Sequence, residues 1–80
     1  MNSNLIRERL NRDTKPFALR LSDGSRVTVL HPDYIAVAPS EIDLVIVWDR
    51  KGRELRIDPH HVVAIEDAPQ KTSANGKQSS

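Results

Sequence analysis

Three histidines lie beside prolines and aspartates, and these are the residues of the chain whose types and spacing could support chemistry. His31 begins the run HPDY, and His60 and His61 lie within the run IDPHHVV. A metal site needs three or four ligands that converge on one ion at about 2.0–2.2 Å. Neighbouring side chains on an extended strand point to opposite faces, so His60 and His61 would not share one metal in that conformation. No HxH or HxxxH spacing is present, and we expect no metal site.

Pairing of a histidine and an aspartate with a serine is the second chemical interpretation. Ser22, Ser25 and Ser40 are the candidate nucleophiles. A serine nucleophile requires a strained turn and preorganised donors for the oxyanion, and the sequence contains no G-x-S-x-G turn. Aspartates beside proline or glycine are instead typical of turns. The sequence therefore predicts a non-catalytic protein without a cofactor, in which both histidine-containing runs are bends between strands.

The length and composition of the chain are those of one small domain. The chain has 80 residues, 38% of them apolar, and Phe17, Tyr34 and Trp48 are its only aromatic residues. A domain of this size leaves about 40% of its unfolded-state surface exposed, so a partner or a second copy would cover part of that surface. The absence of cysteine excludes disulfides and thiolate ligands. The N-terminal segment is polar and no apolar run reaches the ~20 residues of a bilayer span, so we expect a cytoplasmic protein without membrane contact.

A short helix followed by about five short strands, drawn from six strand-like segments, is the predicted order of elements. The helix covers residues from about 3 to 13, with Ser3 or Asn4 as its cap and Pro16 beyond its end. The apolar period then changes to two, which predicts strands at 17–21, 26–30, 34–38, 42–48, 53–57 and 62–65. The segment 42–48 is the most apolar and is the predicted central strand.

These elements predict a mainly β domain over residues 1–67. No segment is long enough for a crossover helix, so the strands should pair in an antiparallel manner. A small SH3-like or Sm-like barrel is the expected architecture, and a curled sheet with the helix across one face is the alternative. The polar residues 68–80 are predicted to be a disordered tail because they offer little apolar surface to bury.

Basic, aromatic and histidine side chains make up the candidate contact set. Arginines and lysines can bind phosphates and aromatic rings can stack on bases, although a net charge of +1 is low for a dedicated nucleic-acid binder. Short strands with exposed edges favour protein association instead. We therefore expect a binding or assembly module for a protein partner or a second copy, with RNA or single-stranded nucleic acid as the alternative. The candidate contacts are Arg7, Arg9, Arg12, Arg26, Tyr34, Trp48, Arg50, Lys51, Arg53, His60 and His61.

Two stretches carry a resemblance to known proteins. The run KPFALRLSDGSRVTVLHPDYIAVAP and the later VWDRKGRELRIDPHHVVAIE resemble a group of small bacterial proteins with the pattern RPFxLxLxDGRxxxVxHPxFxxxxP. The resemblance covers residues 15–66. It implies no activity for this chain, because the group has no known activity to transfer. Ser25 stands where an arginine is common, and Pro59-His60-His61 stands where leucines are common. A weaker topological similarity to Sm-like proteins implies that His60, His61 and the loop 50–53 lie near an RNA or subunit interface.

Overall fold

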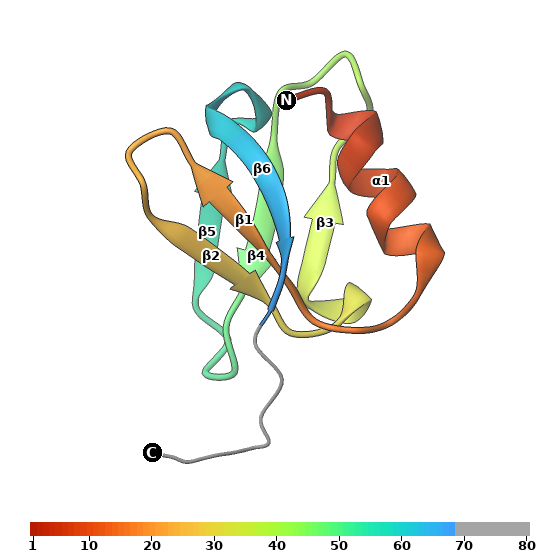
Figure 1. The fold of residues 1–80 in the computed structure, drawn as a ribbon, viewed down its shortest axis with the longest axis vertical. Coiled ribbons are helices and arrows are strands. Elements are labelled where there is room, and N and C mark those ends of the chain that lie inside the picture. The colour runs from red at the N-terminus through yellow and green to blue at the C-terminus, as the bar shows by residue number, and fades with distance from the viewer. Residues whose placement is uncertain (69–80) are drawn as a thin grey trace.

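The computed structural model describes residues 1–68, which form one helix and two three-stranded antiparallel sheets (Figure 1). The elements are α1 (Ser3–Arg12), β1 (Phe17–Leu21), β2 (Arg26–Val29), β3 (Ile35–Val37), β4 (Val45–Trp48), β5 (Glu54–Ile57) and β6 (Val62–Asp67). One sheet has the order β2-β1-β6 and the other has the order β3-β4-β5. The mainly β class and the N-terminal helix are thus confirmed. Of the predicted tail at 68–80, residues 69–80 lie outside the part of the chain that the structure describes.

Helix α1 begins at a side-chain cap and ends well before the first strand. The Asn2 side chain accepts a hydrogen bond from the Asn4 backbone N–H at 2.8 Å, so the cap is Asn2 rather than the expected Ser3 or Asn4. Ile6 projects from the helix into the core and is fully buried. Because a helix of 10 residues is marginal by itself, α1 depends on contacts with the rest of the fold, and the burial of Ile6 is one of them.

Both hairpins use a three-residue loop that ends in glycine. In the first, the N–H of Leu21 donates to the carbonyl of Ser25, and Gly24 has a φ of 90°. In the second, the N–H of Asp49 donates to the carbonyl of Arg53, and Gly52 has a φ of 81°. Positive φ is costly for residues with a Cβ, so each glycine fixes the position of its turn.

The two proline runs are bends, as the sequence predicts, and they separate the sheets. Short 3₁₀ turns occupy Pro32–Tyr34, between β2 and β3, and Pro59–His61, between β5 and β6. Each turn has a side-chain cap, His31 in the first and Asp58 in the second. The sequence predicts a small barrel or a curled sheet, and the described strands instead fall into two antiparallel sheets that do not form a closed barrel. The described part of the chain has six strands, and the predicted central strand at 42–48 is the shorter β4, Val45–Trp48.

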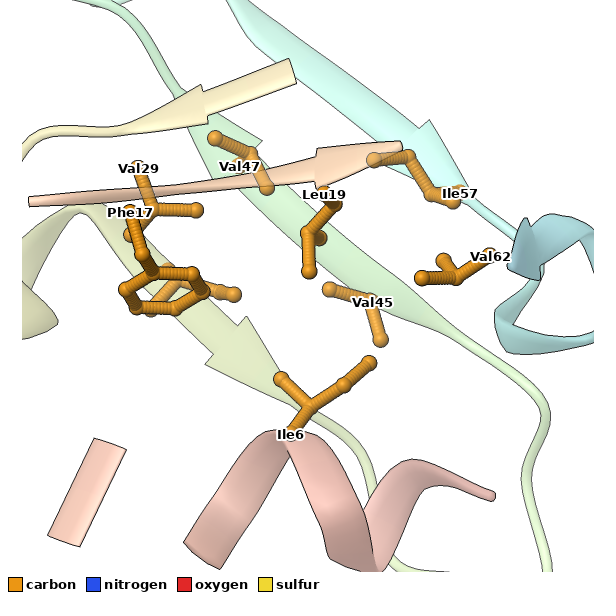
Figure 2. Close-up of a cluster of buried hydrophobic side chains, with 9 residues drawn as sticks. Ile6, Phe17, Leu19, Val29, Val45, Val47, Ile57 and Val62 are labelled. Atoms are coloured by element: carbon orange, nitrogen blue, oxygen red, sulfur yellow. The ribbon is translucent and has the colours of Figure 1, made fainter. Parts of the chain in front are cut away.

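The core lies between the two sheets and is closed at one side by α1. Figure 2 shows Leu19 of one sheet facing Val45 of the other, with Ile6 approaching from the helix. The buried cluster consists of Ile6, Phe17, Leu19, Val29, Ile35, Val45, Val47, Ile57 and Val62. Strand β1 is central to this arrangement because it pairs with both β2 and the distant β6.

Truncation of Leu19 should test this account of the core. Leu19 is fully buried, so Leu19→Ala is expected to lower the free energy of unfolding by about 2–5 kcal/mol through lost burial and a residual cavity. Leu5 is 48% exposed, and Leu5→Ala should cost less than about 1 kcal/mol. Urea unfolding of both variants gives the comparison, and equal losses would contradict the described core.

Candidate functional site

A groove with a largely apolar lining lies between β2 and the β4–β5 hairpin. Its volume is about 470 Å³, and it is lined by Val27, Thr28, Leu30, Val47, Trp48, Asp49, Arg50, Lys51, Arg53, Glu54 and Leu55. The apolar part comes from the strands and the charged part comes from the turn after β4.

Trp48 and Leu55 both line the groove from adjacent pairs of the β4–β5 ladder, and side chains of adjacent pairs point to opposite faces of the sheet. Trp48 is the last residue of β4 and is half-buried, opposite Glu54 in the strand register. Leu55 pairs with the buried Val47, which places its side chain on the core-facing side of the sheet. It is nevertheless 47% exposed, because β5 is an edge strand that no other segment of the described chain covers.

The turn after β4 gives the groove a basic rim. Asp49 accepts hydrogen bonds from the backbone N–H groups of Lys51 and Arg53 and pairs with the Arg53 guanidinium at 2.8 Å. The backbone N–H of Arg53, together with this guanidinium, lowers the pKa of Asp49 below its ordinary value of 3.8. Arg53 is therefore compensated, whereas within residues 1–68 no hydrogen bond or ion pair involves the side chains of Arg50 and Lys51. The rim carries uncompensated positive charge.

Arg9 lies inside the fold and does not contribute to a binding surface. It is only 5% exposed, its guanidinium carbon lies 4.7 Å from the centre of the Phe17 ring, and it pairs with Asp13 at 2.9 Å. This guanidinium fills the space between α1 and the start of β1. The sequence placed Arg9 in the contact set because its charge predicts exposure, and its burial removes it from that set.

Arg7 also serves the fold, from the middle of the helix. Its guanidinium donates to the carbonyl oxygens of Val37, at 3.3 Å, and Ala38, and to the Asn4 side chain at 3.1 Å. These bonds attach α1 to β3. Of the predicted basic residues on the helix, Arg12 is the one that remains exposed.

Arg26 lies on the outer face of its sheet and shares a carboxylate with Arg20. Glu66 accepts from the Arg26 guanidinium at 2.7 Å and from the Arg20 guanidinium at 2.5 Å. The bond from Arg26, reinforced by Arg20, lowers the pKa of Glu66 below its ordinary value of 4.5. This cluster joins β2, β1 and β6 across the sheet, and none of its three side chains lines the groove.

The histidines and Tyr34 occupy the bends and do not converge on one site. Nδ1 of His31 accepts from the Asp33 backbone N–H at 3.1 Å, and Tyr34 is half-buried in the same turn. Nδ1 of His60 lies 3.0 Å from Asp58, whereas Nδ1 of His61 lies 3.5 Å from the Ser22 hydroxyl. In the part of the chain described here, no three histidine and carboxylate side chains are grouped to hold a metal ion.

The structure thus brings four predicted contacts together and disperses the others. Trp48, Arg50, Lys51 and Arg53 line one groove. Sequence reasoning missed the apolar residues that line the groove together with them, namely Val27, Leu30 and Leu55. Period-two alternation identifies the inward face of each strand, but it does not reveal which inward residues lack an opposing layer.

Comparison with known proteins adds no assignment to this geometry. No family model, curated protein or solved structure matches the chain. None of the helices in residues 1–68 has the length and apolar character needed to cross a membrane.

The Glu66 cluster predicts part of the acid sensitivity of the domain. Because the pKa of Glu66 is depressed in the folded state, its contribution to stability is present above about pH 4.5 and is lost as the pH falls through the lower folded value. Glu66→Gln should therefore reduce the difference in melting temperature between about pH 7 and about pH 3. Glu41→Gln, at an exposed loop position, is the control and should leave that difference unchanged.

Proposed function

We propose that the protein is a non-catalytic interaction and assembly module whose groove binds an extended, apolar and acidic segment of a partner protein. The observation that carries this proposal is the combination of an apolar lining, to which Val27, Leu30 and Leu55 contribute, with the uncompensated cations Arg50 and Lys51 at its rim. Apolar side chains of the segment would bury against this lining. Its carboxylates would lie at the rim, where opposite charge favours binding and orients the ligand.

The shape of the groove supports an extended ligand. β2 is an edge strand, and Thr28 on it lines the groove. The antiparallel register pairs Leu19 with Val27 and Phe17 with Val29, and the Leu21–Ser25 bond fixes these as the hydrogen-bonded pairs. The backbone groups of Thr28 therefore point away from β1, toward the groove. An extended segment placed there can form main-chain hydrogen bonds as well as side-chain contacts.

The order of elements also supports a finer fold assignment as part of the proposal. Helix α1 precedes two strands, a bend, three further strands, a second bend and a last strand, β6, which pairs with β1. We propose that this is an open variant of the SH3-like or Sm-like small barrels, in which the bend at Pro32–Tyr34 divides one long strand into β2 and β3. Such folds host many unrelated functions, so the function rests on the groove and not on the fold.

A matched pair of peptides tests the proposal. An extended peptide that alternates leucine with glutamate should quench or shift the fluorescence of Trp48, the single tryptophan, and should displace the apolar anion anilinonaphthalene sulfonate. The same peptide with lysine in place of glutamate should bind about tenfold more weakly, because like charges meet at the rim. Joint reversal by Arg50→Glu and Lys51→Glu should invert this preference. If neither peptide displaces the probe, or if both bind equally, the proposal is wrong.

Single-stranded nucleic acid is the second candidate ligand, and the position of Trp48 beside two cations is the observation that favours it. A base could stack on the indole while phosphates contact Arg50 and Lys51. This alternative predicts that oligothymidine quenches Trp48 with an affinity that falls steeply as salt increases. Peptide binding, which depends mainly on apolar burial, should persist at the same salt. Absence of quenching by oligothymidine at low salt would exclude the alternative.

A further inference from the structure

The four outer strands of the two sheets differ in how their free edges are protected. On β3, the Arg7 guanidinium donates to the carbonyl of Val37. Next to β6, side chains of α1 lie beside Ile65, and the pairing with β1 contains an irregularity between Arg20 and Leu21. β2 borders the groove already described. β5 pairs with β4 alone and has hollows lined by its residues toward both ends, so its edge is open within the described chain.

The register of the hairpin shows which backbone groups lie on this open edge. The N–H of Asp49 donates to the carbonyl of Arg53, which makes this the first hydrogen-bonded pair of the β4–β5 ladder. Bonded and non-bonded pairs alternate in an antiparallel ladder, so Leu55 is bonded to β4 through its pair with Val47. Glu54 and Arg56 fall in the non-bonded pairs. Their N–H and C=O groups therefore point away from β4 and are free to bind another strand.

We propose that β5 pairs in an antiparallel manner with β5 of a second copy, about a two-fold axis at Leu55. In this register Glu54 of each copy lies opposite Arg56 of the other, and these are the residues whose backbone groups point outward. The two Leu55 side chains then form the central, closely spaced pair. The inference rests on the proposed assembly role and names one partner for it.

The charged side chains of β5 are self-complementary in this register, because each one meets a side chain of opposite charge. A two-fold interface requires each surface to match itself. Charged side chains on an edge usually oppose pairing, but Glu54 and Arg56 carry opposite charges and already form a pair at 2.9 Å within one chain. In the dimer both would meet opposite charge across the strands. Leu55, which is 47% exposed in the single chain, would gain an apolar neighbour.

The neighbours of β5 limit the pairing to this short segment. Gly52 turns the chain at one end, and Pro59, which has no N–H to donate, follows the strand at the other. Within these limits the two sheets of order β3-β4-β5 would join edge to edge through β5 into one continuous sheet. Because Leu55 also lines the groove, Leu55 of the second copy would border the groove of the first.

Sedimentation velocity of single and paired charge reversals tests the register. The wild-type chain should reach twice its mass of 9.0 kDa as concentration rises. Glu54→Arg places two arginines opposite each other and Arg56→Glu places two glutamates opposite each other, so each variant alone should dimerise at least about tenfold more weakly. Mixing the two variants restores opposite charges at both positions and should restore the dimer. The double variant, which carries both reversals in one chain, should also dimerise like the wild type.

Matched controls and the peptide probe separate this inference from the proposed function. Glu41→Arg and Arg12→Glu make the same charge changes at exposed positions away from β5 and should leave dimerisation unchanged. A wild-type mass of 9.0 kDa at every concentration up to about 1 mM, or a mixture of the two variants that stays monomeric, would overturn the inference. If those monomers still bind the leucine–glutamate peptide at Trp48, the proposed function stands without the dimer. If the dimer forms but the peptide does not bind, the inference stands and the groove proposal falls.

Discussion

The contact between the apolar faces of the two sheets determines where every other element lies. Each sheet has only three strands, so neither can bury its own apolar face, and Leu19 and Val45 meet because the faces must share one core. The helix adds Ile6 to this core and depends on it for its own stability. The proline bends allow the chain to move between sheets without threading a strand through the core.

Charge in this protein has two different uses, and only the structure separates them. Arg7, Arg9 and Arg26 are bonded within the fold, to carbonyls, to Asp13 and to Glu66 respectively. Arg50 and Lys51, on the turn after β4, project from a rigid hairpin whose glycine and aspartate define its shape. The charges near the groove are therefore held in position by local backbone bonds while their own side chains are available for contacts.

Local features of the fold could be predicted from the sequence, whereas its long-range pairings could not. The helix, the glycine turns and the two proline bends depend on residues a few positions apart, and the structure places them where the sequence predicts. The separation into two sheets depends on β1 pairing with β6, whose residues lie far along the chain. Trp48 was predicted as a contact, but the burial of Arg9 was not. A buried guanidinium depends on Phe17 and Asp13 surrounding it, which local periodicity does not encode.

The bond from Arg7 to Val37 has a consequence for the solubility of the domain. A strand edge with free carbonyl and N–H groups is a template on which other chains can add, and the helix occupies the edge of β3 through this single guanidinium. Loss of the helix would therefore do more than remove Ile6 from the core. It would leave the sheet β3-β4-β5 exposed at both ends, and such a sheet can grow in two directions into a fibre instead of stopping at a pair.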